Sequence, residues 1–292
     1  MTDTAIEAAG LGRRFRRRRG PALDGCAFRL PAGSVCALTG PNGAGKSTLL
    51  ALAAGLLRPT EGTITVLGTT PAAARERLAY VAQNKPLHPQ LTVAGTLRLG
   101  RDLNPRRWDA RAAERIVAEG DLDPDTKIRA LSGGQRTRVA LALGKRPELL
   151  LLDEPMADLD PLARHQLTAT LMADAADRGT TVVMSSHVVA ELEGSCDHLL
   201  LLGSGRVRLA GPLDDLLAAH TLVTGRAGDA LDPHTVVESR TTGRQLTALV
   251  RPAGPLGDAL QGDRPSLEEI VLAHLRSPDA PPLLLDAREA AV

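Results

Sequence analysis

The sequence predicts an α/β fold, and two observations support this prediction. Between about residue 33 and residue 202, short apolar runs alternate with stretches of helical periodicity. Most of these runs are apolar on both faces, as the strands of a parallel sheet are when helices cover both of its sides. In addition, a glycine-rich stretch that reads GPNGAGKST follows one apolar run and precedes a helical one. This order of strand, loop and helix is typical of a phosphate-binding unit in an α/β protein.

The strands of the main domain are expected at the short apolar runs. These runs are Val35–Leu38, Ile64–Leu67, Leu78–Ala82, Leu149–Leu152, Thr181–Ser185 and His198–Leu202. Residues 84 to 130 break the rhythm because they are rich in Arg and Pro, and their clearest helix is Arg111–Glu119. We therefore predict a main domain over residues 1–222, with a helical insert at about residues 84–145.

A change of pattern after about residue 222 indicates a second, smaller unit. Two strands are expected at Thr235–Ser239 and Gln245–Arg251. They precede a helix with a capping box, in which Ser266 caps the helix and Glu269 reaches back to it. One face of this helix is apolar and carries Leu267, Ile270, Val271 and Leu275.

The C-terminal part of the chain is interpreted from this pattern. Residues 223–276 are expected to form a small α+β domain that docks through the apolar helix face. Residues 277–292 are rich in Pro and Ala, and we predict a loose, disordered tail there. The sequence contains no internal repeat and no second phosphate loop.

The stretch GPNGAGKST fits a phosphate-binding loop, in which two glycines separated by four residues are followed by Lys and Ser. The glycines let the backbone curl so that several N–H groups point at one anion. Lys46 brings a cation to the β- and γ-phosphates, Ser47 offers a hydroxyl to Mg²⁺, and the positive end of the following helix faces the phosphate. The candidate nucleotide-binding residues are Gly40, Pro41, Asn42, Gly43, Ala44, Gly45, Lys46, Ser47 and Thr48.

An acidic pair, Asp153 and Glu154, follows four leucines at the end of an expected strand. Burying two carboxylates costs several kcal/mol unless a metal or a partner compensates. In phosphate-loop enzymes an acid at this place holds Mg²⁺, and the next acid can act as general base toward the attacking water. We therefore assign Asp153 to the metal and Glu154 to the water. The alternative is a helix N-cap followed by an acid that the helix dipole favours.

A second candidate anion site lies at Leu131–Gln135, which reads LSGGQ and precedes an apolar-periodic run. Ser132 and Gln135 have the spacing of a capping box, which predicts a helix start. Gly133 and Gly134 leave N–H groups accessible at this start, where the helix dipole favours an anion.

The composition limits the classes of function. The formal net charge of +1 gives no general attraction to nucleic acid or to anionic lipid, and the few aromatic residues leave little for bases to stack on. We therefore expect no nucleic-acid partner. The three cysteines lack paired metal spacing. No apolar stretch is long enough to span a bilayer and the N-terminus lacks a secretory apolar segment, so a cytosolic protein is expected.

The motifs together resemble the ATP-binding subunit of an ABC transporter, because GPNGAGKST, LSGGQ and LLLLDEP occur in the order of that family. The resemblance covers residues 1 to about 222 and implies a P-loop NTPase fold of the ABC type, with a helical subdomain. It also implies that Gln83 senses Mg²⁺ and contacts the helical insert, that Asp160 lines a dimer interface, and that His187 holds the γ-phosphate. Phe15 matches the aromatic residue that this family places under the adenine.

Each of these residues has a simpler interpretation when it is taken alone. Gln83 would be a polar surface residue, His187 an ordinary histidine at a capped helix, and Phe15 a core ring beside a strand.

The sequence also departs from the family in two places. Residues 136–152, a stretch of 17, are about two fewer than expected, and two residues turn a helix face by about 200°. The turn at Gly144–Pro147 is expected to absorb this difference unless the packing behind LSGGQ changes. The second departure is MADLD, where a small or hydroxyl residue followed by Gly is commoner.

The resemblance implies an ATPase that works as a dimer, with ATP and Mg²⁺ held between the phosphate loop of one subunit and the LSGGQ of the other. The implied partners are a second copy of the chain, or a paired ATPase subunit, and a separate integral-membrane permease. The protein is then expected in the cytoplasm, peripheral on the cytoplasmic face of the membrane. The extension after residue 222 resembles that of drug- and antibiotic-export members, which favours export.

Two alternatives remain at this point. The first is a soluble ABC-type ATPase with no transport role, acting in DNA repair, translation or cofactor assembly. Such proteins usually carry a coiled-coil insert, zinc-binding cysteines or two ATPase halves, which this sequence lacks. The second is a regulatory subunit that binds ATP without useful turnover, against which Glu154 and His187 count.

Overall fold

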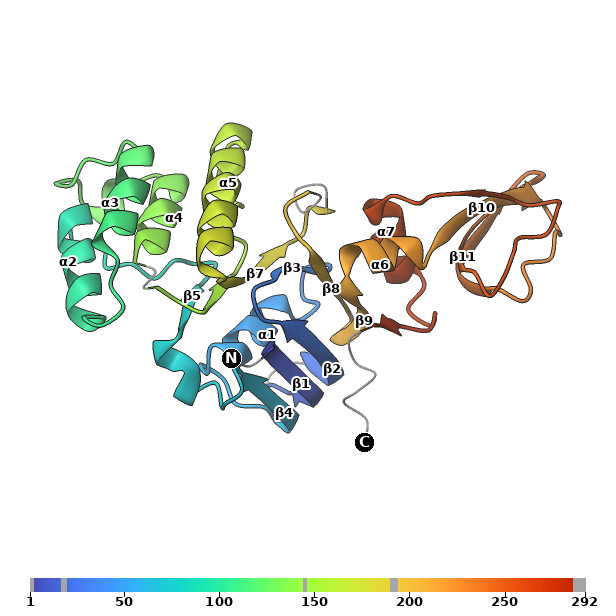
Figure 1. Cartoon of the computed structure of the whole chain (residues 1–292), viewed down its shortest axis with the longest axis horizontal. Coiled ribbons are helices and arrows are strands. Elements are labelled where there is room, and N and C mark those ends of the chain that lie inside the picture. Colours follow the sequence, from blue (N-terminus) through green and yellow to red (C-terminus); the bar gives the residue numbers. More distant parts are fainter. Residues whose placement is uncertain (1–2, 17–19, 144–145, 190–193, 286–292) are drawn as a thin grey trace.

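The computed structural model describes residues 3–16, 20–143, 146–189 and 194–285. Its central element is a seven-stranded sheet in the order β14-β9-β8-β3-β7-β6-β5 (Figure 1). All neighbouring strands in it are parallel except β8 and β9. The strands are β3 (Val35–Thr39), β5 (Leu78–Val81), β6 (Leu149–Leu152), β7 (Thr181–Ser186), β8 (His198–Gly203), β9 (Arg206–Pro212) and β14 (Leu283–Leu284). Five of the six strands expected in the main domain belong to this sheet, which confirms the α/β prediction.

Both faces of this sheet are covered, which explains why its strands read as continuous apolar runs. Along β6, Leu149 and Leu151 pack into one core cluster, whereas Leu152 packs into the other. On β8, Leu200 packs into the first cluster and Leu199 into the second. The first cluster includes α1 (Lys46–Ala53). The second includes residues of α4 (Gly133–Ala142), α5 (Pro161–Arg178), α6 (Leu213–Ala218) and α7 (Leu267–Arg276).

A separate antiparallel sheet in the order β2-β1-β4 packs on the first face. Its strands are β1 (Thr4–Arg13), β2 (Leu23–Pro31) and β4 (Glu61–Val66). The run Ile64–Leu67 was expected as a strand, and it is confirmed as part of β4; it lies outside the seven-stranded sheet, because Ile64 pairs antiparallel with Ala8. β1 and β2 were not predicted from the sequence, because both are rich in residues of low strand propensity. Long-range pairing and the burial of Leu11 and Phe28 hold them in place.

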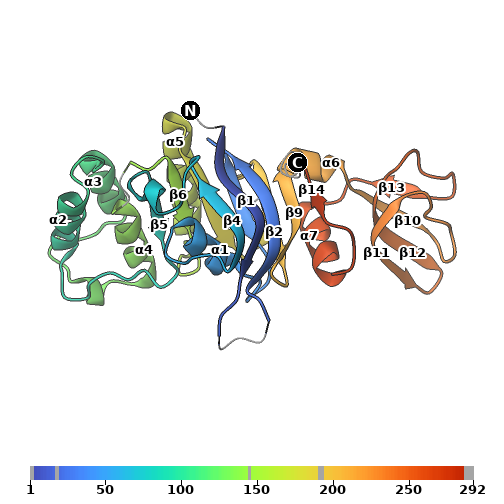
Figure 2. The same cartoon turned by 90° about the horizontal axis from the view of Figure 1, so that it is seen from below.

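The helical insert predicted at about residues 84–145 is present at one end of the molecule (Figures 1 and 2). It contains α2 (Val93–Leu103), α3 (Ala110–Glu119), a short 3-10 turn (Ile128–Ala130) and α4 (Gly133–Ala142). Each helix begins at a side-chain cap, which is Thr92 for α2, Asp109 for α3 and Ser132 for α4. Residues 144–145 lie outside the described part of the chain.

The C-terminal unit lies at the other end of the molecule, beyond the edge of the central sheet (Figure 2). A four-stranded sheet in the order β11-β12-β10-β13 follows α6 (Leu213–Ala218). The strands are β10 (Thr221–Arg226), β11 (Thr235–Thr242), β12 (Gln245–Arg251) and β13 (Gln261–Asp263). The predicted boundary at residue 222 falls inside β10. The Ser266–Glu269 capping box is confirmed at the start of α7.

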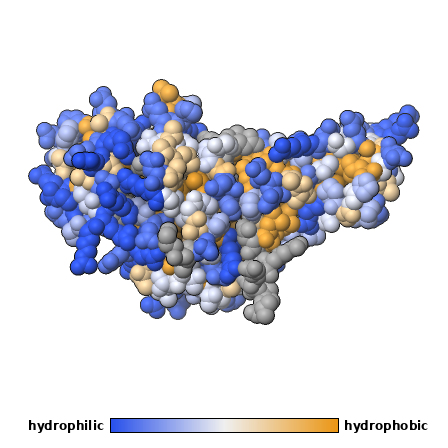
Figure 3. All heavy atoms as spheres, in the orientation of Figure 1, coloured by the Kyte–Doolittle hydropathy of each residue, from blue (hydrophilic) through white to orange (hydrophobic). Residues whose placement is uncertain are grey.

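The apolar face of α7 packs into the second core cluster of the main sheet, with Ile270 fully buried beside residues of β8 and β9. The segment after α7 differs from the loose tail predicted for residues 277–292. Leu283 and Leu284 form β14, which pairs with β9 at the sheet edge, and residues 286–292 lie outside the described ranges. In Figure 3 apolar residues gather over α6, whereas the helical insert shows a mostly hydrophilic surface.

Within the residues that the structure describes, none of the helices is both long and apolar enough to cross a membrane.

A buried histidine pair lies where α6 and β10 meet α7. The Nε2 atoms of His220 and His274 are 3.1 Å apart, and His220 Nδ1 donates to the Leu216 carbonyl at 2.7 Å. Both rings are almost completely buried. Burial lowers the pKa of both imidazoles, and that of His274 falls to about 3. The folded protein therefore holds this pair in its neutral form.

Because the folded protein holds this pair in its neutral form, we expect the protein to lose stability in mild acid. A histidine in the unfolded chain has a pKa near 6.5, so its neutral form stabilises the fold fully above that pH. Below it, each buried histidine should remove up to about 1.4 kcal/mol of unfolding free energy per pH unit. Thermal unfolding between pH 7.5 and 5.5, where carboxylates stay ionised, measures this effect. The double variant His220→Leu, His274→Leu should flatten the profile, and the exposed His88→Leu should not. Equal stability at both pH values would contradict the argument.

Candidate functional site

The predicted phosphate loop connects the end of β3 to the start of α1. Gly40 and Gly45 adopt φ angles of 143° and 112°, which L side chains rarely adopt. A Cβ on Gly40 would collide with the Leu202 carbonyl, and one on Gly45 would lie 2.6 Å from the Ala22 carbonyl oxygen. The two glycines therefore allow the loop to lie directly against its neighbouring strands and to curl toward the helix.

Lys46, the first residue of α1, lies inside this loop with a side chain that is 6% exposed. Its Nζ donates to the Gly40 carbonyl at 2.7 Å and to the Pro41 carbonyl at 3.3 Å. It also lies 3.9 Å from Glu154 Oε1. Burial lowers the pKa of Lys46, and the charges of Glu154 and Asp153 oppose that shift. The loop thus places a largely desolvated ammonium where phosphate oxygens would enter.

Asp153 is the buried acid of the site and is 2% exposed. Its Oδ1 accepts hydrogen bonds from Ser47 Oγ at 3.1 Å and from Ser185 Oγ at 2.9 Å. The Tyr80 hydroxyl also donates to this carboxylate, and burial together with the charge of Asp153 raises the pKa of Tyr80 to about 12. The structure therefore brings Ser47 and Asp153 together, as the sequence predicted.

Glu154 collects three of the predicted site residues around one carboxylate. Gln83 Nε2 donates to Glu154 Oε2 at 3.2 Å, and His187 Nδ1 lies 3.6 Å from Glu154 Oε1, beside Lys46. Glu154 has a φ of 47°, a left-handed conformation that costs a non-glycine residue about 1–3 kcal/mol. Its backbone N–H donates to Ser185 Oγ at 2.8 Å, which helps to hold this conformation. The strained backbone directs the carboxylate toward the phosphate loop.

Sequence reasoning missed Ser185 and Tyr80. Ser185 lies on β7 within the VVMSSH stretch that ends in His187, and Tyr80 lies on β5 just before Gln83. Their only sequence signal is this proximity to two assigned residues. Neither contact with Asp153 can be read from spacing, because Ser185 and Tyr80 are 32 and about 70 residues away in the chain.

The LSGGQ segment lies elsewhere, at the start of α4 in the helical insert. Ser132 Oγ accepts from the Gln135 N–H at 3.2 Å and Gln135 Oε1 accepts from the Ser132 N–H at 3.0 Å, which confirms the capping box. A Cβ on Gly133 would lie 2.7 Å from Asp158 Cβ, so close packing also requires this glycine. In the described part of the chain, no hydrogen bond or ion pair joins the segment to Lys46 or to the acidic pair.

Asp160 and Phe15 also lie apart from the Glu154 cluster. Asp160 caps α5 by accepting from the Ala163 N–H at 2.9 Å. Phe15 follows β1, is half-buried, and lies under the Arg13 guanidinium, 4.7 Å from ring centre to Arg13 Cζ. Their predicted roles at a dimer interface and under an adenine remain predictions.

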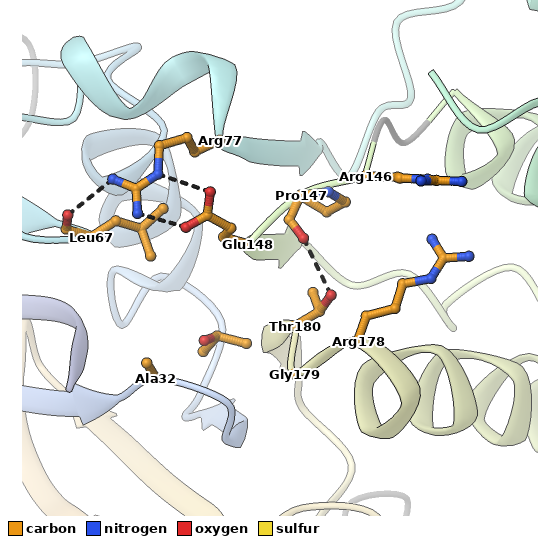
Figure 4. A pocket seen from close by; sticks show the side chains of 10 residues that line it. Ala32, Leu67, Arg77, Arg146, Pro147, Glu148, Arg178, Gly179 and Thr180 are labelled. Atoms are coloured by element: carbon orange, nitrogen blue, oxygen red, sulfur yellow. Dashed lines mark hydrogen bonds and ion pairs between the residues drawn. The ribbon is translucent and has the colours of Figure 1, made fainter. Parts of the chain in front are cut away.

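A pocket of about 600 Å³ lies at the opposite ends of the strands of the sheet (Figure 4). Glu148 and Thr180 line it just before β6 and β7 begin, so it opens at the amino ends of these strands. Glu148 forms ion pairs with Arg77 at 2.6 Å and Arg107 at 3.2 Å. These arginines lower the pKa of Glu148. Because Arg107 belongs to the helical insert, this network joins the insert to the sheet.

The short stretch between Gln135 and Asp153 includes Arg146 and Glu148, whose backbones hydrogen-bond to Arg107 and Arg77 of the same network. The predicted turn at residues 144–147 lies partly outside the described ranges. At its described end, the Arg146 N–H donates to the Arg107 carbonyl at 2.8 Å, and the Glu148 N–H donates to the Arg77 carbonyl at 2.7 Å. Backbone hydrogen bonds to the insert and to the residue before β5 therefore hold the chain in place where β6 begins.

Comparison with known proteins identifies the family of this chain. A family model described as ABC transporter matches residues 23–157. The chain is 34% identical to a daunorubicin resistance ATP-binding protein of Streptomyces coeruleorubidus, over 96% of this chain and 98% of that protein. It is 37% identical to a Nod factor export ATP-binding protein I of Rhizobium meliloti, over 70% of this chain and 64% of that relative, so it spans just under two thirds of that protein.

A solved structure gives the same result for the fold. The structure of an ATP-binding subunit of an ABC transporter matches 74% of this chain and 92% of its own, with a TM-score of 0.65 and 29% identity. The phosphate loop, the acidic pair and the LSGGQ helix start all lie within the residues that the family model matches. This chain belongs to the ABC transporter family, as one of its ATP-binding proteins, an ABC-type ATPase.

Proposed function

We propose that this protein binds and hydrolyses ATP·Mg²⁺ as a dimer and thereby drives a separate membrane permease, in the direction of export. The observation that carries the proposal is the cluster at Glu154, where Lys46, Gln83 and His187 surround one carboxylate beside the buried Asp153. The export direction is supported by relatives whose names refer to Nod factor export and daunorubicin resistance.

The residues present fit a magnesium ion. Ser47 Oγ and Asp153 Oδ1 are 3.1 Å apart and offer the oxygen ligands that Mg²⁺ prefers, of which one or two normally suffice beside substrate phosphates. Ser47 and Asp153 would hold the ion, with Gln83 nearby. When bound, Mg²⁺ would neutralise charge on the β- and γ-phosphates.

The remaining residues have separate tasks in hydrolysis. Lys46 stabilises the negative charge of the β- and γ-phosphates in a largely desolvated loop. Glu154 accepts the proton of the water that attacks the γ-phosphorus, and the bond to the β-phosphate oxygen breaks. His187, which is half-exposed beside Glu154, contacts the γ-phosphate, and Gln83 orients the Glu154 carboxylate.

The second half of each site comes from a partner subunit. Gly133 and Gly134, in the first turn of α4, have a partly exposed backbone but lie in the helical insert, away from Lys46 of the same chain. A second copy related by twofold symmetry would bring its LSGGQ segment onto this phosphate loop and complete two equal sites. Asp160 would lie at that interface, and Phe15 would pack under the adenine.

Mixed variants test this arrangement directly. Lys46→Ala damages the phosphate loop and Ser132→Arg blocks the partner half, so neither variant alone should release phosphate from ATP. A mixture can form one intact site, from the phosphate loop of the Ser132→Arg chain and the LSGGQ of the Lys46→Ala chain. We expect the mixture to show ATPase activity well above the sum of its components. If the mixture remains inactive while mixed dimers form, the sandwich arrangement is wrong.

A groove beside the site supports the permease partner. A cavity of about 350 Å³ is lined by Tyr80 and Val81 from the core and by Pro86, Asn104 and Leu143 from the insert. Next to it, Leu103 at the end of α2 is 71% exposed. A permease segment in this groove would contact the core and the insert together, and would hold the protein on the cytoplasmic face of the membrane.

Leu103→Asp is therefore expected to weaken copurification of the permease by about tenfold, because one lost apolar contact of 1–2 kcal/mol has that effect. The ATPase activity of the isolated chain should not change. Leu56→Asp is the matched control, since Leu56 is also exposed but follows α1. Equal losses for both variants, or none for either, would speak against the groove as the docking site.

We also propose that residues 223–276 act as an accessory domain. Its four-stranded sheet has a small core of its own around Val223, Ala248 and Val250. The docking of α7 on the main sheet links this domain to the ATPase core.

A further inference from the structure

Lys85 and Asp158 form an ion pair that the proposed function does not use. Lys85 Nζ lies 2.5 Å from Asp158 Oδ2, and the Lys85 side chain is 5% exposed. Lys85 follows Gln83 by two residues and Asp158 follows Glu154 by four. Lys85 also has a φ of 42°, a left-handed conformation that is unfavourable for a lysine. The pair thus joins the two loops that supply Gln83 and Glu154.

The carboxylate end of the pair packs against LSGGQ. A Cβ on Gly133 would lie 2.7 Å from Asp158 Cβ and 3.2 Å from Asp158 Oδ2, and one on Gly134 would lie 2.8 Å from Leu159 Cδ2. The first turn of α4 therefore rests directly on Asp158 and Leu159. Because the two glycines of LSGGQ have no side chains that could move aside, a shift of Asp158 should move the first turn of α4.

The ammonium end of the pair reaches the groove between the core and the insert. Lys85 lines this groove together with Pro86 and Leu87. An ammonium that is shielded from water is unfavourable unless its carboxylate partner stays close. Lys85 and Asp158 should therefore move together, and the groove, the Gln83 loop and LSGGQ are connected through them.

We propose that Lys85 and Asp158 are a positioning pair that sets the orientation of LSGGQ for its contact with the partner subunit's nucleotide. The inference rests on the proposed function, since it needs the dimer. Asp158 is half-exposed in the single chain, beside the segment that would face the partner. Closure of the dimer would reduce the water around the pair and strengthen its attraction.

The test measures ATP-dependent dimerisation in the Glu154→Gln background, by sedimentation across a range of protein concentrations. Lys85→Met and Asp158→Asn should each weaken dimerisation about tenfold, while ATP binding to the single chain stays within about twofold. The exchanged pair Lys85→Asp, Asp158→Lys should recover most of the loss. Lys127→Met, which changes an exposed lysine of the insert, should have no effect.

The outcomes separate this inference from the proposed function. If the Glu154→Gln parent does not dimerise with ATP, the dimer proposal fails and this inference fails with it. If the parent dimerises and the single variants dimerise equally well, the positioning role alone is overturned. If the exchanged pair is no better than the single variants although its thermal unfolding matches the parent, the charges do not act on each other and the inference is again overturned. Lys85→Arg, which keeps the charge, should dimerise like the parent, and its failure would also count against the pair.

Discussion

Replacing Glu154 with Gln is expected to stop ATP hydrolysis while ATP binding continues and the dimer becomes trapped. Glutamine keeps the size of the side chain and can still contact Gln83 and His187, but it cannot accept the proton of the attacking water. Removal of a general base slows a reaction by about 10²–10⁴-fold. Phosphate release measures the loss of turnover, and size-exclusion chromatography with ATP detects the trapped dimer.

The matched control is Glu148→Gln at the other end of the same strand. Glu148 forms ion pairs with Arg77 and Arg107 at the amino end of β6, so its variant should lose stability but keep turnover. If Glu154→Gln hydrolyses ATP at the normal rate, Glu154 is not the base. A loss of similar size in both variants would point to a general effect on the sheet instead of the chemistry at its carboxyl end.

Replacing Lys46 with Ala is expected to abolish measurable nucleotide binding. Its ammonium is largely desolvated inside the phosphate loop, within 3.9 Å of Glu154 and near Asp153. Without this cation, the triphosphate would face two carboxylates with no compensating charge from the loop. In a binding site, removal of one partner of a buried charge pair costs about 2–5 kcal/mol, which corresponds to a factor of about 30 to several thousand in affinity.

Titration with a fluorescent ATP analogue measures the affinity of this variant. Lys127→Ala is the control, because Lys127 is exposed in the helical insert. Unchanged affinity in Lys46→Ala would refute the site. Thermal unfolding should show that the variant is folded, since the two hydrogen bonds that the Lys46 amine donates go to carbonyls of its own loop.

Much of the site could be predicted from the sequence because its chemistry is local in the chain. Two glycines around four residues, followed by Lys46 and Ser47, specify a curled loop at a helix start whatever surrounds them. The capping boxes at Ser132 and Ser266 are confirmed for the same reason, since each depends on residues three positions apart. The strand before Asp153 was recognised because a parallel strand covered on both faces must be apolar throughout.

The rest depends on contacts between residues far apart in the chain. The antiparallel pairing of β4 with β1 and the pairing of β14 with β9 join segments whose composition is poor in strand formers or rich in proline. Neither pairing is visible in periodicity, because the stabilisation comes from the partner strand and from burial.

The sequence alone determined which residues we assign to the chemistry: the phosphate loop, the acidic pair and the LSGGQ helix start. The tertiary structure decided how they are supported, by placing Tyr80 and Ser185 on Asp153 and by joining Lys85 to Asp158. The physical reason is that a loop or a cap is specified by neighbours a few residues away. A hydrogen bond to a buried carboxylate is instead specified by the register of the strands that bring the two groups together.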